Sequence, residues 1–95
     1  MFFTLVASFD PNVKNYYTAQ FGVDYPGNDI IHHPAIIYYD CLAECSSNPS
    51  CVGIATSFDP AGNTDVSTTP IECWLKSKFD NKVDSNIRII DVKNA

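Results

Sequence analysis

The sequence predicts a small α+β domain in which one helix packs on β-strands and disulfide bonds join the two. Three observations predict it: one segment with cysteines a helical turn apart, several short runs rich in β-branched and aromatic residues, and four cysteines among only 95 residues. Because this length suffices for one domain and not for two, we assign residues 1–95 to a single domain. The hydrophobic fraction of 45% argues against a disordered chain.

The expected helix begins at Tyr38 or Tyr39 and ends at Ser46 or Ser47, before the helix-terminating Asn48-Pro49. Apolar and β-branched runs predict the strands, and clusters of Asp, Asn, Gly and Pro predict the loops. The expected strands are residues 2–9, 16–21, 51–58, 71–76 and 87–92, and the expected loops are residues 22–29, 32–33 and 59–70. Residues 71–76 are expected to return beside 51–58 as a hairpin.

The cysteine spacing is the most specific feature of the sequence. Cys41 and Cys45 are four residues apart, so a helix places both sulfurs on one face. Cys45 is close to Cys51 across the turn at residues 48–50, which leaves Cys41 to reach Cys73. We therefore predict two nested disulfides, Cys45–Cys51 inside Cys41–Cys73, and hence an oxidising, extracellular environment. A zinc site and buried free thiols are the alternatives.

The charge balance excludes several partners. The chain has six Lys and Arg against eleven Asp and Glu, a formal charge of −5. Nucleic-acid binding needs a cationic surface, and so does adsorption to an anionic membrane, so neither is expected. The apolar run at residues 2–9 is far shorter than the roughly 20 residues that a membrane-spanning helix needs. We expect no membrane insertion.

Neither catalysis nor a cofactor is expected. His32 and His33 are adjacent, but no third ligand follows at a helical or hairpin spacing, so we predict no metal site. The chain contains no Gly-x-Ser-x-Gly turn to hold a nucleophilic serine, and oxidised cysteines would leave no thiolate. The two histidines are interpreted as part of a polar loop between Ile31 and Pro34.

The turn around Pro26-Gly27 supplies the first candidate binding residues. Tyr25, Asn28 and Asp29 combine a polar aromatic ring with hydrogen-bonding groups, as small sugar sites often do. The alternative role is structural, with Asn28 and Asp29 accepting hydrogen bonds from backbone amides of the turn.

The strand at 71–76 supplies the second group. Alternation along a strand places Trp74 on the face opposite Cys73 and Leu75, where it is either a sugar-stacking platform or a structural residue. Lys76 and Lys78 are expected on one strand face, where they either join such a site or keep an edge strand soluble.

Taken together, four segments resemble the PAN/apple family. In chain order they are Asp-Tyr-Pro-Gly-Asn-Asp-Ile at 24–30, Cys-Leu-Ala-Glu-Cys at 41–45, Asn-Pro-Ser-Cys at 48–51 and Cys-Trp-Leu-Lys at 73–76. The resemblance covers about residues 16–79 and is closest to the variant in cellulose-binding elicitor proteins of oomycetes. Apple domains of blood proteases carry a third disulfide that joins the termini; this chain has no cysteine for it and resembles the shorter, two-disulfide variety.

The resemblance implies one helix cradled by a curved antiparallel sheet with the same nested disulfides. It also implies a secreted or cell-surface protein that binds carbohydrate or extracellular protein partners, for example in adhesion, without catalysis. A second hypothesis is a structural subunit of an extracellular fibre, wall or appendage that self-associates through edge strands and termini. Exposure of the aromatic run at 2–9 would favour that second hypothesis.

Overall fold

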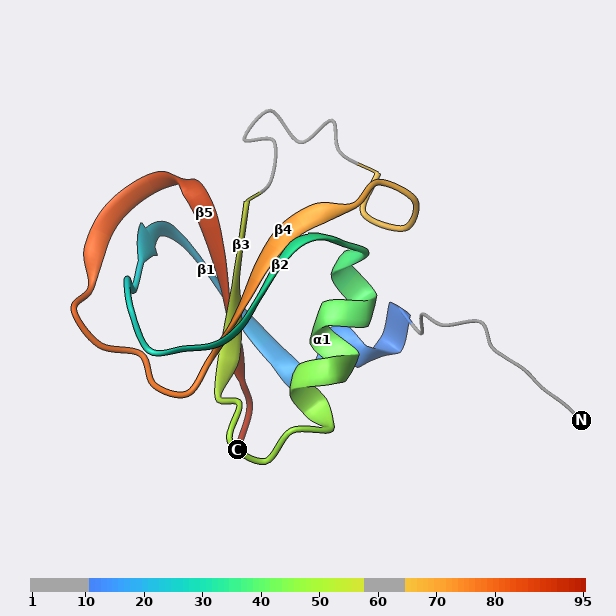
Figure 1. Ribbon diagram of the computed structural model, residues 1–95, viewed down its shortest axis with the longest axis horizontal. Helices are drawn as coiled ribbons and strands as arrows, with labels where there is room; N and C mark the ends of the chain where they lie inside the picture. The colour runs from blue at the N-terminus through green and yellow to red at the C-terminus, as the bar shows by residue number, and fades with distance from the viewer. Residues whose placement is uncertain (1–10, 58–64) are drawn as a thin grey trace, which may run out of the picture.

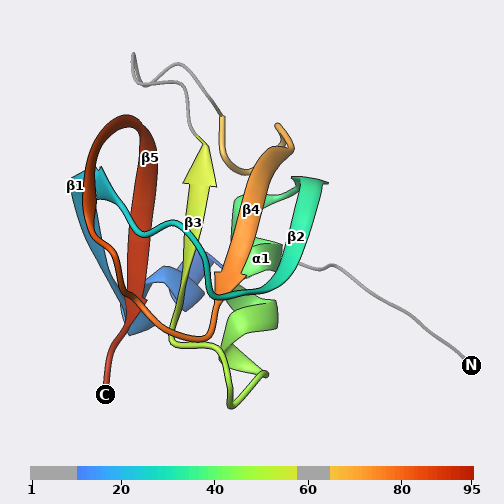
Figure 2. The same cartoon turned by 60° about the vertical axis from the view of Figure 1, so that its left-hand side comes forward.

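In the part of the chain that the structure describes, five antiparallel strands form one sheet, and one α-helix packs against one face of it (Figure 1). The computed structural model describes residues 11–57 and 65–95. The described elements are the 3₁₀ helix η1 (Pro11–Tyr16), β1 (Tyr17–Asp24), β2 (Asp29–Ile36), α1 (Tyr38–Ser46), β3 (Gly53–Ser57), β4 (Ile71–Lys76) and β5 (Val83–Lys93). Figure 2 shows the strands side by side in the order β1-β5-β3-β4-β2.

The face covered by α1, here called the inner face, carries the main core. Side chains alternate along β4, so Cys73 and Leu75 point to the helix and are fully buried. Leu75 pairs with Ile54 of β3, which is also fully buried. The buried cluster comprises Val13, Tyr17, Tyr38, Cys41, Leu42, Cys45, Cys51, Ile54, Ile71, Cys73 and Leu75. These residues form one apolar layer between α1 and the sheet.

The cysteine spacing predicts one helix and two nested disulfides, and the structure confirms both. Cys41 and Cys45 lie on the buried face of α1 and are fully buried. Cys41 bonds to Cys73 on β4, and Cys45 bonds to Cys51 just before β3. The helix is thus covalently joined to β4 and to the segment that leads into β3, and the described part of the chain has no free cysteine.

The edge strand β1 and its neighbour β5 extend beyond the predicted runs at 16–21 and 87–92. They pair with each other from Tyr17 opposite Lys93 to Asp24 opposite Val83, with a bulge between Phe21 and Val23. Cross-strand pairing brings Asp24 and Asp84 into the ladder, although no local apolar pattern predicts a strand at either residue. The preceding helix η1 was likewise not predicted from the sequence.

The interpretation of His32 and His33 as a polar loop is wrong, because both lie in β2. Among the described strands, β2 is at the edge of the sheet and pairs with β4 alone. Pro34 stands where the pairing register shifts, between His33 and Ile36, and an edge or bulge position tolerates a residue without a backbone N–H. Pro34 therefore excludes a helix here without excluding a strand.

The predicted antiparallel pairing of β3 with β4 is confirmed, with β3 starting at Gly53 rather than residue 51. The expected strand at 2–9 lies outside the described residues, as does the 59–64 part of the expected loop. In its described part, Thr68 and Thr69 donate backbone hydrogen bonds to the Asp65 carbonyl, which forms a turn. Among the described residues, no helix has the length and hydropathy that a bilayer crossing needs.

Two connections cover the opposite face, here called the outer face: the β1–β2 turn and the β4–β5 connection (Figure 1). The Phe79 ring approaches Gly53 so closely that a Cβ there would lie 2.6 Å from it and 2.3 Å from the Asp91 carbonyl oxygen. Phe79 also packs on Tyr25 with ring centroids 5.0 Å apart. These contacts hold both connections in place over the sheet.

Replacing both Cys41 and Cys73 with alanine is expected to lower the free energy of unfolding by about 4 kcal/mol, since the lost bond closes a span of 32 residues. The same change at Cys45 and Cys51, which are 6 residues apart, should cost about 2 kcal/mol. Urea unfolding followed by Trp74 fluorescence measures both losses. Equal losses in the two variants would contradict the loop-closure account.

Candidate functional site

A polar cleft of about 230 Å³ lies on the outer face of the sheet. It forms where the β1–β2 turn passes over β4, β3 and β5. Its lining residues are Asp24, Pro26, Gly27, Asp29, Ala55, Trp74, Lys76 and Arg88. Three of the residues singled out from the sequence, Asp29, Trp74 and Lys76, therefore meet in one place.

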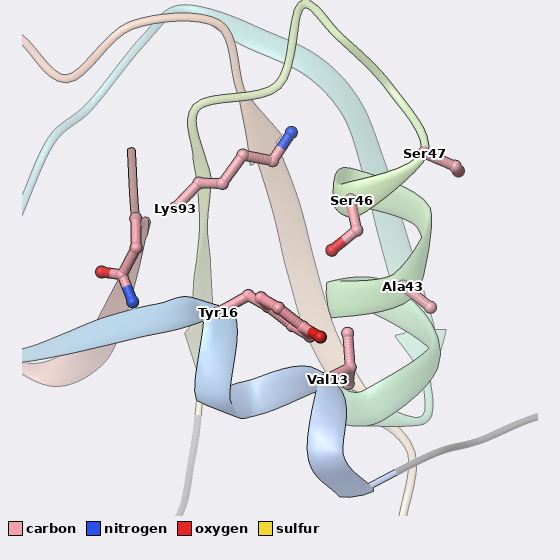
Figure 3. Close-up of a pocket in the computed structure, with 7 residues that line it drawn as sticks. Val13, Tyr16, Ala43, Ser46, Ser47 and Lys93 are labelled. Carbon is pink, nitrogen blue, oxygen red and sulfur yellow. The ribbon is translucent and has the colours of Figure 1, made fainter.

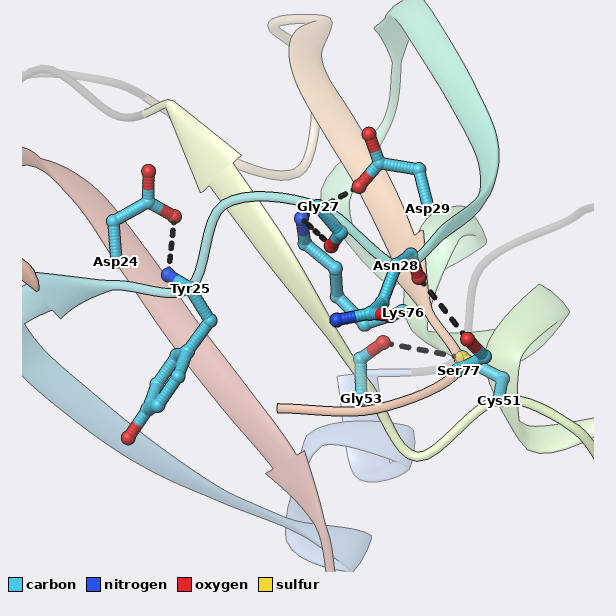
Figure 4. A network of polar contacts seen from close by, with 9 residues as sticks. All are labelled: Asp24, Tyr25, Gly27, Asn28, Asp29, Cys51, Gly53, Lys76 and Ser77. Carbon is cyan, nitrogen blue, oxygen red and sulfur yellow. Dashed lines mark hydrogen bonds and ion pairs between the residues drawn. The ribbon is translucent and has the colours of Figure 1, made fainter. Parts of the chain in front are cut away.

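Lys76 anchors the cleft as a buried cation. Its side chain is only 4% exposed, and its Nζ donates hydrogen bonds to the Gly27 carbonyl at 3.0 Å and to Asp29 Oδ1 at 2.5 Å (Figure 4). Asp29 lies directly opposite Lys76 in the pairing of β2 with β4, which sets this contact. A buried charge needs such partners, and an ammonium group has three N–H donors. The third N–H of this ammonium group has no acceptor among the described residues.

Trp74 lies on the outer face, as strand alternation predicts, but its ring faces are already in contact with other groups. The His32 ring stacks on it with centroids 4.7 Å apart and planes 2° apart. The Arg88 guanidinium lies 4.5 Å from its centroid. These partners come from strands on opposite sides of β4. A sugar could stack on the indole only by displacing one of them, so the indole is available to a ligand chiefly at its edge.

Arg88 and Asp24 bring one further cation and one further anion to the cleft. Arg88 donates to the Ile87 carbonyl at 3.2 Å, and no carboxylate of the described chain pairs with it. Asp24 accepts a hydrogen bond from the Tyr25 amide at 2.8 Å, and no basic side chain of the described residues pairs with it. Both charges therefore face the cleft without a neutralising partner.

Tyr25 and Asn28 hold the turn rather than line the cleft. The Tyr25 hydroxyl donates to Gln20 Oε1 at 2.8 Å. Asn28 adopts a left-handed conformation (φ 61°), which asparagine tolerates, and its carbonyl accepts hydrogen bonds from the backbone and the hydroxyl of Ser77 (Figure 4). The expected alternative, in which the side chains of Asn28 and Asp29 accept from backbone amides of the turn, is not what these contacts are: Asn28 accepts through its main-chain carbonyl, and Asp29 accepts from Lys76.

Lys78 does not join the cleft. The strand ends at Lys76, so the expectation that Lys76 and Lys78 share one strand face is wrong. Lys78 is exposed and lies 3.6 Å from Asp80 in the following connection. The expectation that these lysines keep an edge strand soluble is also wrong for Lys76, because β4 lies between β3 and β2 and Lys76 is buried.

Sequence reasoning missed Asp24 and Arg88 as site residues. Arg88 reaches Trp74 across β3, from a strand that begins seven residues after β4 ends. Only the strand order brings the two side chains together, and no local motif signals it. Asp24 is the first residue of the Asp-Tyr-Pro-Gly-Asn-Asp-Ile segment at 24–30. That segment drew attention to the turn, but nothing in it indicated that Asp24 would line a cleft.

The two histidines do not form a metal site. Being adjacent on a strand, they point to opposite faces: His32 lies 2.6 Å from Glu72, and His33 lies 2.7 Å from Glu44 of α1. Within residues 11–57 and 65–95, no group of three His, Cys, Asp or Glu side chains is arranged to hold a metal ion.

A larger cavity of about 620 Å³ lies between η1, the end of α1 and the end of β5 (Figure 3). Two of its polar groups are bonded within the chain: Ser46 Oγ to the Tyr17 hydroxyl at 2.9 Å, and Lys93 Nζ to the Asn48 carbonyl at 3.2 Å. Its lining contains one charged side chain, Lys93, against four in the outer-face cleft, and we do not assign it a ligand.

One buried carboxyl group lies apart from the cleft, on the inner face. Asp91 is 3% exposed, accepts a hydrogen bond from the Tyr38 hydroxyl, and has no partner for Oδ2 among the described residues. Burial raises the pKa of Asp91 to about 6, although the Tyr38 hydrogen bond and Lys14 oppose the rise. Burial also raises the pKa of Tyr38 and of Tyr17.

Comparison with family models, curated proteins and solved structures gives no match for this chain. The role of the cleft is therefore inferred from its own residues and their contacts.

Asp91 is expected to make the fold less stable as the pH rises from about 4 to about 6. The folded state holds the proton to about pH 6, whereas an unfolded aspartate loses it near 3.8, so unfolding becomes easier by roughly 3 kcal/mol across this window. Urea unfolding of the wild type and of Asp91→Asn at several pH values measures the difference. The variant should gain stability relative to the wild type as the pH rises; parallel curves would contradict the assignment.

Proposed function

We propose that this chain is an extracellular, non-catalytic recognition module of the PAN/apple type, and that its outer-face cleft binds carbohydrate. The location is supported by the two disulfides, because such bonds persist in oxidising compartments. The family is supported by the four sequence segments described above. The helix, the antiparallel sheet and the nested bridges agree with what that family resemblance implies.

The observation that carries the binding proposal is the set of unsatisfied polar groups around one cleft. Arg88 has free donors, Asp24 has a free acceptor, and Lys76 has one remaining N–H. A ligand for these groups must both donate and accept hydrogen bonds over a short distance. Sugar hydroxyls do so on neighbouring carbons. Carbohydrate is therefore the ligand class that best fits the groups present.

The cleft is also held rigidly before any ligand binds. Its wall at Gly27 and Asp29 is fixed by Lys76, and the turn between them is fixed by Ser77 through the Asn28 carbonyl (Figure 4). A pre-ordered site loses less conformational entropy on binding than a flexible loop. This rigidity favours a recognition role for the turn.

The histidine contacts support a non-catalytic role. In the described part of the chain, each histidine is bonded to a glutamate on a neighbouring element, and neither is bonded to a serine, threonine or cysteine. A nucleophile paired with a base is the arrangement that covalent catalysis uses. The His–Glu pairs instead bridge β2 to β4 and to α1.

The double variant Asp24→Asn/Arg88→Gln is expected to lose carbohydrate binding. Hydrogen bonds to charged groups are worth about 1.5–3 kcal/mol each, so retention on the best of a panel of immobilised polysaccharides should fall at least about tenfold. Affinity electrophoresis of the oxidised protein measures this. Lys82→Gln, an exposed change outside the cleft lining, is the matched control. Unchanged retention of the double variant would locate binding elsewhere.

A second candidate function is a self-associating structural subunit, favoured by exposed apolar side chains beside an edge strand. Phe21 on β1 is 71% exposed, and Ile87 on β5 is 56% exposed. Among the described elements, β1 pairs with β5 alone. The backbone groups along its other edge could therefore pair with a strand of a second copy.

Self-association predicts a sedimentation coefficient that rises with protein concentration. The rise should be smaller in the Phe21→Ser variant, because that variant buries less apolar area between copies. Sedimentation velocity over a hundredfold range of concentration tests this. A wild-type protein that stays monomeric throughout would eliminate the structural hypothesis.

A further inference from the structure

We propose that the outer-face cleft selects a single neutral sugar ring over acidic and amino sugars. This inference rests on the proposed carbohydrate function and specifies its ligand class. Three features of the cleft carry it: its size, its balance of charge, and the contacts on both sides of Trp74.

The volume limits the ligand to one ring. The cleft measures about 230 Å³. Pockets for drug-sized ligands occupy roughly 300–1,000 Å³, so this one is too small for an oligosaccharide to enter as a whole. One ring of a glycan, or a free monosaccharide, is the appropriate size.

The charges that line the cleft cancel. Two carboxylates, Asp24 and Asp29, stand against two cations, Lys76 and Arg88. Lys76 and Asp29 neutralise each other by direct contact, which leaves Arg88 and Asp24 as the unpaired charges. A sugar carboxylate that bonds to Arg88 also approaches Asp24, and a sugar ammonium that bonds to Asp24 also approaches Arg88. A neutral ring avoids both repulsions, since one hydroxyl accepts from Arg88 while its neighbour donates to Asp24.

The charge of the whole chain acts in the same direction against acidic ligands. The formal net charge is −5, so the field around the domain opposes the approach of anions. Arg88 is one cation in a chain of net negative charge, so it offsets this field only close to its own guanidinium.

The covered faces of Trp74 indicate how a ring would be recognised. With His32 and Arg88 against the indole, the sugar meets polar groups and a ring edge instead of an open aromatic platform. Selectivity then depends on the positions of hydroxyl groups, and affinity for one ring is low, with a Kd on the order of 1 mM.

The test is a titration of the ¹⁵N-labelled, oxidised protein followed by amide chemical shifts. The probes are glucose, galactose and mannose, each with its matching uronic acid and its 2-amino sugar, and glycine as a small zwitterion. We expect at least one neutral hexose to shift the amides of Gly27, Asp29, Lys76 and Arg88. Its uronic acid and amino counterparts should bind at least about threefold more weakly at equal ionic strength, the size of an exposed charge interaction.

Two single variants test the cause of the selectivity. Asp24→Asn removes the repulsion of a carboxylate and should narrow the preference for the hexose over its uronic acid. Arg88→Gln removes the repulsion of an ammonium and should narrow the preference over the amino sugar. Lys82→Gln, which lies outside the cleft lining, should leave both ratios unchanged. Dispersed amide spectra confirm that each variant is folded.

The outcomes separate this inference from the proposed function. If a uronic acid, an amino sugar or glycine binds the cleft more tightly than every neutral hexose, the proposed selectivity for neutral sugars is wrong. Tighter binding of a uronic acid or an amino sugar would still agree with the proposed carbohydrate-binding function. No shift with any sugar, together with no retention on any polysaccharide, would overturn both. If a neutral hexose binds preferentially but neither Asp24→Asn nor Arg88→Gln changes its affinity relative to the uronic acid and the amino sugar, the charge-balance explanation is wrong.

Discussion

The disulfide between Cys41 and Cys73 ties the buried side of α1 to the middle of β4. Because side chains alternate along a strand, a cysteine held under the helix directs Leu75 into the core and Trp74 to the opposite face. Lys76, three residues beyond Cys73, is directed to that outer face as well. One covalent bond therefore maintains the core and, through the pleat of β4, orients the side chains that build the cleft.

Among the described residues, one lysine and one aspartate are buried, on opposite faces of the sheet. Lys76 on the outer face has a carboxylate and a carbonyl as partners. Asp91 on the inner face has the Tyr38 hydroxyl, and its Oδ2 has no partner among the described residues. A buried charge is tolerated in proportion to such partners, so the cleft side is electrostatically compensated whereas the core side destabilises the ionised state. The compensated side is the one suited to meet a ligand without rearrangement.

The edge strand β2 connects the two faces through its adjacent histidines. His32 stacks on Trp74 on the outer face, and His33 bonds to Glu44 of α1 on the inner side. Asp29 begins the same strand and bonds to Lys76. The strand that carries one wall of the cleft is thus held to β4 and to the helix by side-chain contacts as well as by backbone pairing, which keeps that wall in a defined position.

Local patterns in the sequence determined the helix, the β3 and β4 strands, the Cys45–Cys51 bond and the outward direction of Trp74, because each depends on the spacing of a few neighbouring residues. The Cys41–Cys73 bond, which spans 32 residues, followed as the one remaining pair. Tertiary structure alone decided that His32 and His33 belong to a strand, that Lys78 lies away from Lys76, and that Arg88 and Asp24 complete the cleft. These outcomes depend on which strands become neighbours. Backbone pairing between distant segments sets that order, and no local side-chain period encodes it.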